Sequence, residues 1–450
     1  MQRKTITISI LLAMIFMLFA RCQNKNERPS AATRSVETAN DFDNGDNESI
    51  YERFEGLAEH LDNYFGDADR PEMKEVGGVV YSKDLSTLIY CPPSREGGLE
   101  MPESVTTIAN FAFEGSSISS ITLSPRLKEI GDRAFTYCPN LQTINLPKRV
   151  DYDFLLDHFF NNFLRQIQYI HVHPGNKELS DINGVLFNKD QTTLLLYPNG
   201  RSDDYRVPSS VKTIGRSAFQ NSLVASVVLP QGLTTIQDNA FADSPISSIV
   251  LPSSVEEIGV GAFNTCYSLT SITLPQRYVY DENTSGQFVY SAIEAIYVDN
   301  NNPYLTSMDG VLFTKDGETL VCYPSRLTDP YTVPDGVKRV DSFAFFNAQS
   351  PSVVLAESVE YAGDYCFFES AIESITLPEG ELHMGKEVLG VCEYLQTIRI
   401  KSVTPPTAVD QETGISEERK EDITLYIPAG AKTVHQNDKA WGGFESYVEE

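Results

Sequence analysis

The chain has 450 residues, of which 62 are acidic and 35 are basic, and its net charge is −27. This balance excludes most nucleic-acid-binding proteins, because phosphate binding needs clustered Lys and Arg, and seven Cys are too few for a disulfide scaffold of this length. Hydrophobic residues make up 41% of the chain, enough for a large core, and the length by itself fits about three ordinary domains.

The N-terminus, residues 1–22, predicts export. Two basic residues precede an uncharged apolar run over 6–19, which is too short to span a membrane comfortably and is typical of a secretory signal peptide. Cys22 follows directly, and this arrangement resembles the signal of bacterial lipoproteins, in which the Cys is acylated and becomes the mature N-terminus. Arg21 departs from that pattern, which has Gly, Ala or Ser there, so a plain signal peptide with an incidental Cys is the alternative. The resemblance implies a lipid anchor on the outer membrane or cell surface of a Gram-negative bacterium.

A tether and a helix are expected next. Residues 23–48 are polar and acidic without an apolar period, which predicts a flexible tether. Residues 49–70 are interpreted as an N-terminal cap, because Ser49 and Glu52 fit a capping box and apolar residues then follow helical spacing to residue 65. The simplest partner for this apolar face is the first turn of the body that follows, and a helix that binds a partner protein is the alternative. The apolar face consists of Ile50, Phe54, Leu57, Leu61 and Phe65.

The body, residues 71–400, is built from a short repeat. The pair Ala-Phe recurs with a local step of 22 residues, and Leu-Pro after a β-type triplet recurs with a similar step. One full unit, residues 249–266, reads IVLPSSVEEIGVGAFNTC. The side chains of its triplet alternate inward and outward as in a short strand, and Pro ends the strand. The Val-x-x-Ile-Gly segment forms the return limb of the coil, with Val and Ile pointing inward and Gly at the turn. Phe then fills the space between coils. No single unit can bury these groups alone, so the repeat predicts a solenoid.

A longer repeat lies over the short one. Three blocks start near Gly78, Gly184 and Gly310, each with Gly-Val, two further β-type residues, a polar residue, Lys-Asp and then Thr-Leu. Two apolar runs joined by such polar residues predict a hairpin at the start of each block. Turn chemistry explains the carboxylates that recur in these hairpins, which are Asp84, Asp190 and Asp316.

These motifs resemble the BspA-like leucine-rich repeat family over about residues 75–400. The resemblance implies a right-handed, curved leucine-rich-repeat superhelix, mainly β, with a sheet on the concave face and short irregular or 3-10 segments on the convex side. Residues 401–450 lose the period and are similar to the closing segment of Bacteroides-type surface proteins. The residues there predict a final strand, a break at Pro428-Ala429-Gly430, a short helix, and Trp441 as a plug. Members are typically exported, often surface-attached, associated with adhesion and protein binding, and not as a rule enzymes. Ten triplets are expected as strands, beginning at Ile121, Ile144, Ile170, Val227, Ile249, Ile272, Ile296, Val353, Ile375 and Ile398.

No residue cluster in the sequence predicts catalysis, a metal or a cofactor. His171 and His173 have metal-pair spacing, but the internal repeat aligns them with Tyr297 and Asp299 and no third ligand lies near. The motifs of serine hydrolases, zinc proteases and phosphate loops are absent from the sequence. Three Cys share one position of the repeat, which predicts small buried apolar groups rather than a catalytic thiol. These are Cys138, Cys266 and Cys392.

The outward strand positions form a mild surface of small residues with little charge, and its largest members are His171 and Tyr297. Such a face suits a broad protein or glycan partner better than a catalytic pocket, although Ser, Thr and Val are also simply good strand residues. Residues 148–168 and 276–295 replace regular coils. The first of these segments is strongly aromatic and is interpreted as a helical or irregular bulge packed on the solenoid, with ligand binding as the alternative. The candidate ligand-binding residues are His171, Tyr297, Thr122, Asn145, Val228, Val250, Thr273, Thr376 and Arg399.

The sequence therefore predicts a non-enzymatic cell-surface lipoprotein, acylated at Cys22, that binds protein or mediates adhesion through its repeat surface. The alternative is a structural or glycan-binding scaffold in a surface assembly that handles polysaccharide. Neither hypothesis involves nucleic acid, and the only contact expected with a membrane is through the N-terminal lipid.

Overall fold

The computed structural model describes residues 50, 54, 56–64, 72–158, 165–280 and 286–450, all within one compact unit over 46–450. The signal segment with Cys22, the tether over 23–48, and Ser49, Glu52 and Phe65 of the expected N-terminal helix lie outside the described residues. The expectation of one continuous helix over 50–65 is wrong, because Phe54 and Gly56 are not helical and the φ of Gly56 is +84°.

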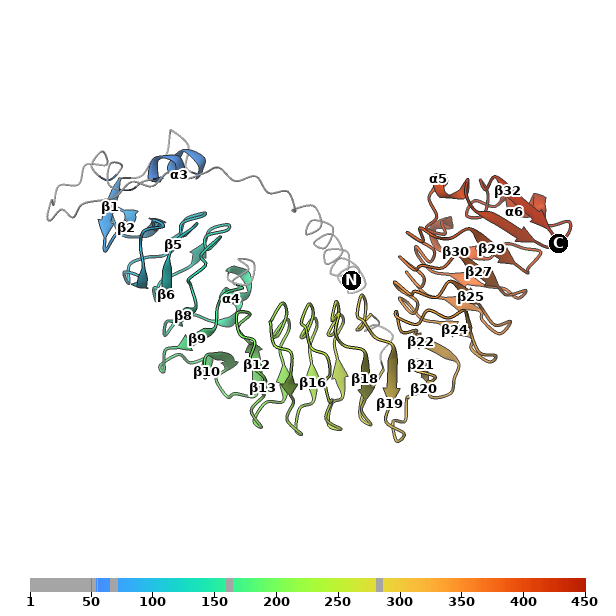
Figure 1. Cartoon of the computed structure of the whole chain (residues 1–450), viewed down its shortest axis with the longest axis horizontal. Coiled ribbons are helices and arrows are strands. Elements are labelled where there is room, and N and C mark those ends of the chain that lie inside the picture. Colours follow the sequence, from blue (N-terminus) through green and yellow to red (C-terminus); the bar gives the residue numbers. More distant parts are fainter. Residues whose placement is uncertain (1–49, 51–53, 55, 65–71, 159–164, 281–285) are drawn as a thin grey trace. The chain divides into compact units, whose positions relative to one another are not determined.

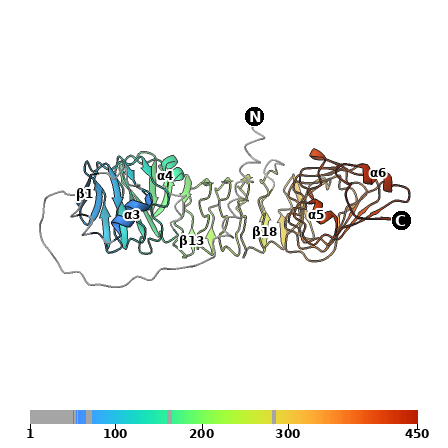
Figure 2. The ribbon, with the colours of Figure 1, turned by 90° about the horizontal axis from the view of Figure 1, so that it is seen from above.

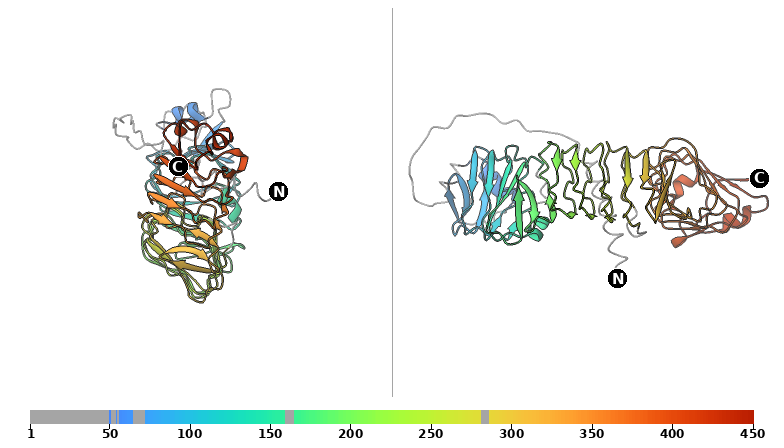
Figure 3. Two further views of the ribbon diagram at one scale, coloured as in Figure 1. Left: turned by 90° about the vertical axis from the view of Figure 1, so that its right-hand side faces the viewer. Right: turned by 90° about the horizontal axis from the view of Figure 1, so that it is seen from below.

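The described chain is a β-solenoid of about 16 turns with few short helices, as the repeat predicts (Figure 1). Successive coils lie next to each other in chain order, as their colours show in Figure 2 and Figure 3. Identical positions of neighbouring coils pair in parallel register; Ile121, for example, is opposite Ile144. The coils therefore stack at the usual strand spacing of about 4.8 Å.

The Ile-x-Leu triplets form the first side of each coil, here named the triplet strands. Nine of the ten expected triplets lie in strands, but Ile249 does not, and its coil contributes only an isolated bridge between Ser226 and Ser248. Four further strands on this side were not expected: β4, β13, β23 and β32. The final strand expected before Pro428 is present as β31. The triplet strands are β4 (Gly97–Glu100), β6 (Ile118–Thr122), β8 (Thr143–Leu146), β9 (Tyr169–Val172), β13 (Tyr205–Arg206), β15 (Val227–Val228), β18 (Ser271–Leu274), β19 (Ala295–Val298), β23 (Tyr331–Thr332), β25 (Ser352–Val354), β27 (Ser374–Leu377), β29 (Thr397–Ile400), β31 (Thr424–Ile427) and β32 (Ser446–Glu449).

The Val-x-x-Ile segments form a second parallel ladder that the sequence interpretation, which had only an inward-pointing return limb there, did not include. Two residues per coil are enough to pair, as Ile214 does with Ile236 and Ile236 with Ile258. The Ala-Phe segments turn irregularly and close the coil, and Phe219 N–H donates to the carbonyl of Ala240 at 2.7 Å. The second ladder contains β5 (Thr107–Ile108), β7 (Glu129–Ile130), β14 (Thr213–Ile214), β16 (Thr235–Ile236), β17 (Glu257–Ile258), β24 (Arg339–Val340), β26 (Tyr361–Ala362), β28 (His383–Met384) and β30 (Thr407–Ala408).

The three predicted hairpins exist, and each has an additional antiparallel strand before it. A two-residue turn with positive φ at both positions, such as Asn183-Gly184, joins this extra strand to the hairpin. Asn-Gly and Asp-Gly are the sequence signal of such turns. Residues 183–184 and 309–310 therefore indicate the extra strands of the second and third blocks. The hairpin units are β1 (Met73–Val76), β2 (Val79–Ser82) and β3 (Thr87–Tyr90), β10 (Leu179–Ile182), β11 (Val185–Asn188) and β12 (Thr193–Leu196), and β20 (Leu305–Met308), β21 (Val311–Thr314) and β22 (Thr319–Cys322).

The hairpin units also divide the core. One hydrophobic cluster fills the coils of each block. Three side chains of the next hairpin unit complete the first two clusters, and residues of the C-terminal segment, including Trp441, complete the third. In the first hairpin unit the equivalent side chains instead pack against α3 (Leu57–Tyr64) together with Ile50 and Phe54. The helix α3 thus covers the face of the first hairpin unit that, in the second and third hairpin units, packs on the preceding block. The three equivalent sets are Met73, Val80 and Ile89, then Leu179, Leu186 and Leu195, and then Leu305, Leu312 and Val321.

A buried asparagine connects the blocks at both internal joints. Asn302 donates two hydrogen bonds, to the carbonyls of Pro275 at 2.8 Å and Tyr278 at 3.0 Å. Its side-chain oxygen accepts two more, from the backbone N–H groups of Tyr304 and Leu305. Asn176 makes the equivalent four bonds at the first joint. Each side chain therefore holds the end of one block against the first strand of the next.

Short helices occur only outside the regular coils in the described part of the chain. The insertion over 148–168 contains α4 (Tyr152–His158), and Leu155 joins the first core; Phe288 of the second insertion joins the second core. In the C-terminal segment Trp441 is fully buried, and its Nε1–H donates to the carbonyl of Pro406 at 2.8 Å. The other helices there are η3 (Val409–Gln411), α5 (Glu417–Lys420) and α6 (Lys432–Asn437).

Candidate functional site

The outward side chains of the triplet strands form the surface that contains all nine candidate ligand-binding residues. The structure separates them into groups, because the triplet ladder is interrupted at both internal joints and again within the second block, between β15 and β18. Thr122, Asn145 and His171 are opposite one another in the first block, Thr273 is opposite Tyr297 in the second, and Thr376 is opposite Arg399 in the third. Val228 and Val250 occupy the same position on consecutive coils of the second block, where Val250 lies in no strand.

Most polar candidates already have partners among their neighbours. Asn145 Nδ2 donates to Thr122 Oγ1 at 3.1 Å. His171 Nδ1 lies 3.4 Å from Asp181 Oδ2. Arg399 forms an ion pair with Glu450, and its guanidinium lies 4.9 Å from the ring centroid of Tyr426. The most exposed candidates are instead apolar or aromatic, because Val250 is 81% exposed and Tyr297 is 52% exposed.

A larger surface emerges in three consecutive coils of the second block, here named the neutral face. Three exposed side chains, Leu223, Pro245 and Tyr267, follow one another at steps of 22 residues. They were missed because they precede the triplet, although the same 22-residue step marks them. None of the side chains of the neutral face is charged. The nearest charged residues include the exposed Asp243, two residues before Pro245, and Asp204 and Glu294 on the two flanks. The neutral face consists of Leu223, Ala225, Ser226, Val228, Pro245, Ser247, Ser248, Val250, Tyr267, Ser268, Thr270, Ser271 and Thr273, none of them buried.

The opposite side of the same coils is charged. Lys212, Glu256 and Glu257 are exposed along the second ladder. One coil therefore presents a charged side and an uncharged side, and the lack of charge on the neutral face is not a property of these coils as a whole.

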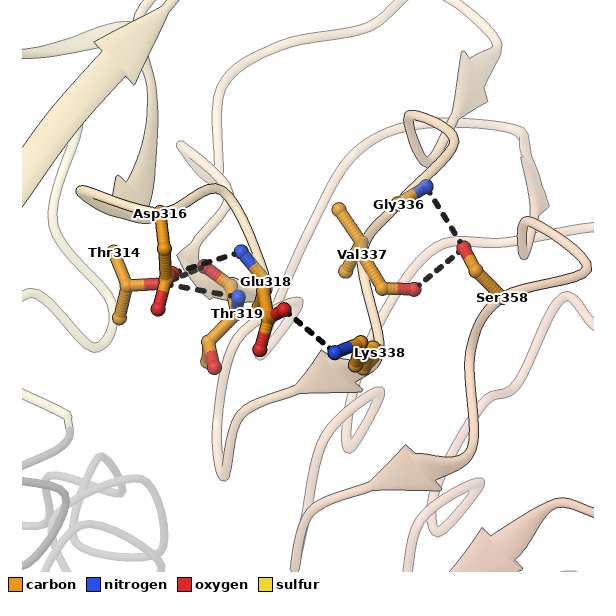
Figure 4. Close-up of polar contacts among 8 residues, drawn as sticks. All are labelled: Thr314, Asp316, Glu318, Thr319, Gly336, Val337, Lys338 and Ser358. Carbon is orange, nitrogen blue, oxygen red and sulfur yellow. Dashed lines mark hydrogen bonds and ion pairs between the residues drawn. The ribbon is translucent and has the colours of Figure 1, made fainter.

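The aspartates of the hairpins serve their turns. Asp316 accepts hydrogen bonds from Thr314 Oγ1 at 2.7 Å and from the backbone of Glu318 at 3.0 Å (Figure 4). Asp84 is held in the same way, and hydrogen bonds from Ser82 and Ser86 lower the pKa of its carboxyl to about 2. In the second hairpin the equivalent backbone groups are bound by Asn188 rather than Asp190. Figure 4 also shows the ion pair between Lys338 and Glu318, which links the hairpin to the next coil at 2.5 Å.

The repeated cysteines are buried as expected and are also hydrogen-bond donors. Their thiols donate to the carbonyls of Phe residues one coil earlier, for example Cys266 to Phe241 at 3.2 Å. Burial raises the pKa of Cys266 and Cys392 to about 11 and that of Cys138 to about 12. The thiols are therefore protonated at neutral pH and poor nucleophiles.

One carboxyl with a strongly shifted pKa connects the second insertion to the third block. Asp341 replaces the Gly of the Val-x-x-Ile-Gly segment and is fully buried. Tyr280 Oη donates to its Oδ2, and Arg339 lies 3.4 Å from its Oδ1. Burial raises the pKa of this carboxyl to about 7. Tyr280 belongs to the second insertion and is 61 residues from Asp341 in the sequence. We therefore assign Asp341 to the packing of this insertion against the third block.

The described residues contain neither a cluster of metal ligands nor a helix that could span a membrane. No three His, Cys, Asp or Glu side chains gather there as metal ligands. Every helix in that part of the chain is too short or too polar to cross a bilayer.

The fold is similar to solved structures of low sequence identity. A leucine-rich repeat protein from Eubacterium ventriosum is 17% identical with a TM-score of 0.42, covering 78% of this chain and 76% of that one. A leucine rich cell surface protein from Faecalibacterium prausnitzii is 20% identical with a TM-score of 0.41, covering 85% and 96%. The pneumococcal vaccine antigen PcpA is 17% identical with a TM-score of 0.38, covering 84% and 98%. No curated protein matches the sequence significantly.

The family model of the BspA type leucine rich repeat region matches six copies, over residues 97–193, 197–308 and 322–406. These ranges contain more than half of the chain and most of its regular coils. Such repeats are typical of bacterial surface proteins and are generally non-enzymatic. The chain belongs to the BspA-type leucine-rich repeat family.

Proposed function

We propose that this protein is a non-enzymatic, surface-exposed lipoprotein that binds a partner protein through the neutral face. In this proposal Cys22 carries the lipid, residues 23–48 are the tether, and the repeats are displayed on the outer membrane or cell surface. The support is the family, whose members are typically surface proteins, and the signal-like N-terminus.

One observation carries the proposal: the neutral face is uncharged on a chain whose net charge is −27. The cores of protein interfaces are depleted in charge and enriched in aromatic residues. The neutral face shares the lack of charge, and its exposed apolar or aromatic side chains include Val250, Tyr267 and Leu223, which are 81%, 67% and 55% exposed. Exposed apolar groups gathered in this way mark interaction surfaces more often than scattered ones do.

A defined binding panel tests the proposal. The full mature chain is applied to an array of extracellular-matrix proteins and glycans, and we expect at least one protein to bind. Val250→Glu places a charge in the neutral face and should weaken that binding at least tenfold. Val279→Glu is the matched control, because Val279 is 46% exposed and its N–H bonds to Glu256 on the charged side. Equal effects of the two substitutions would refute the neutral face as the binding surface.

The anchor has its own test. Mass spectrometry of the mature N-terminus should find an acylated Cys22, and protease treatment of intact cells should degrade the repeats. A mature protein that begins unmodified at Gln23 or later contradicts the lipid anchor. If the array shows no binding of any kind, the alternative of a structural scaffold in a polysaccharide-handling assembly is favoured.

A further inference from the structure

The outward surface of β8 and β9 differs chemically from the neutral face. Tyr169 and His171 lie on the same side of β9, and their rings are parallel within 7° with centroids 6.2 Å apart. Asn145 is opposite His171 on the neighbouring strand, and Thr143 is opposite Tyr169. An aromatic surface with an amide, an imidazole and a hydroxyl beside it is thus accessible at the end of the first block.

The backbone holds Tyr169 in place. The ring lies against the turn between β10 and β11, where Gly184 has a φ of +81°. A Cβ at this glycine would lie only 2.8 Å from Tyr169 Cδ1, so no other residue fits there without a shift. The guanidinium of Arg201 lies 5.8 Å from the ring centroid, yet 42% of Tyr169 stays exposed. The ring is therefore positioned before any ligand arrives, which lowers the entropic cost of binding.

A carboxylate holds His171. Asp181 Oδ2 lies 3.4 Å from His171 Nδ1, and Asp181 Oδ1 accepts the backbone N–H of Val172 at 2.8 Å. His171 Nε2 makes no hydrogen bond to the described residues, and the imidazole is half exposed. The pair thus presents one oriented ring nitrogen and a partly accessible carboxylate to a ligand.

We propose that Asn145, Tyr169, His171 and Asp181, here named the aromatic subsite, bind a sugar ring of an uncharged glycan. The apolar C–H face of a pyranose packs on an aromatic side chain, while its hydroxyl groups need a few fixed donors and acceptors such as amide, imidazole and carboxylate groups. Acidic sugars are disfavoured by Asp181 and by the net charge of −27. This site is separate from the neutral face and goes beyond the proposed protein binding.

The second block provides an internal control. By the internal repeat, the positions of Tyr169 and Asp181 are held there by Ala295 and Ser307. Tyr297 stands at the position of His171 and is exposed, but it has neither a second ring beside it on β19 nor a carboxylate at the position of Asp181. A lone exposed ring is thus present at the equivalent place without the other groups of the aromatic subsite.

Affinity electrophoresis of the full mature chain tests the site, with starch, xyloglucan, mannan and galactan as neutral probes and polygalacturonate as the acidic probe. We expect at least one neutral polysaccharide, and not polygalacturonate, to retard the protein. Tyr169→Ala and Asn145→Ala should each weaken that binding at least tenfold, whereas Tyr297→Ala should leave it unchanged. Thermal unfolding checks the fold, and if Tyr169→Ala unfolds the joint, His171→Ala, which removes a half-exposed side chain, decides the result.

The inference is overturned if no neutral polysaccharide retards the protein, or if Tyr297→Ala weakens binding as much as Tyr169→Ala. Val250→Glu should not change glycan binding, because the neutral face is a different surface. Loss of protein binding with glycan binding retained, or the reverse, therefore separates the two proposals.

Discussion

Asn302→Ala should uncouple the second block from the third. The side chain is 1% exposed and makes four hydrogen bonds to backbone groups, two as donor and two as acceptor. A buried hydrogen bond contributes about 1 kcal/mol net, so the loss of four predicts about 4 kcal/mol of destabilisation at the joint. Water that enters the space lowers this cost, whereas buried groups left unpaired raise it.

The neighbouring Asn301→Ala is the matched control, because Asn301 is exposed and its side chain bonds only to Asp299, at 3.2 Å. Urea unfolding followed by circular dichroism should show a separate early transition for Asn302→Ala and one near wild type for Asn301→Ala. Because repeat arrays lose two-state behaviour when an interface weakens, hydrogen exchange should locate the early opening at residues 302–314. A difference of less than about 1 kcal/mol between the two variants would refute the four-bond reasoning.

Three further predictions follow from buried side chains. Leu61→Ala should lower the free energy of unfolding by about 3 kcal/mol, because the Leu61 side chain of α3 is fully buried against the first hairpin unit. Faster hydrogen exchange in β1 to β3 would show this loss of stability. Native Cys266 should react with a disulfide reagent at pH 8 far more slowly than the unfolded protein does, because burial raises its pKa to about 11, and a fast native reaction contradicts its burial. The unfolded Asp341 carboxyl loses its proton near its ordinary pKa of 3.8, whereas the buried one keeps it to about pH 7, so its burial costs stability increasingly between these values. Asp341→Asn should therefore raise the melting temperature relative to wild type more at pH 8 than at pH 4, and an equal effect at both pH values contradicts this assignment.

The solenoid was predictable because its information is repeated. A step of 22 residues places Ala240 beside Ala218 and Phe241 beside Phe219, and the rings of the latter pair do stack, with centroids 4.9 Å apart. The second ladder was not predicted because two paired residues per coil leave no alternating pattern long enough to indicate a strand. The strand expected at Ile249 is the reverse case. Its triplet fits the strand pattern, but the backbone of its coil forms only the isolated bridge between Ser226 and Ser248.

The surfaces were predictable only in part. The outward positions of the triplets follow from the strand period, so the sequence indicates His171 and Tyr297 correctly as outward-facing residues. What it does not indicate is which outward residues share a surface, because the hairpin units interrupt the ladder at positions that depend on tertiary pairing. The contact of Asp181 with His171 illustrates this, since it joins β10 to β9 across a joint.

The interrupted ladder has a consequence for how such a chain uses its length. In an uninterrupted sheet, a partner could bind anywhere along one continuous face, and its position would be set by side chains alone. Here each of the two internal hairpin units separates one triplet ladder from the next, and the coil of Ile249 interrupts the ladder of the second block as well. The neutral face lies within the second block and the aromatic subsite at the end of the first. Because each core cluster also ends at a joint, side chains on one block can change with little effect on the packing of the next. A chain built in this way can hold chemically different surfaces on successive blocks, and the buried Asn176 and Asn302 fasten each block to the next.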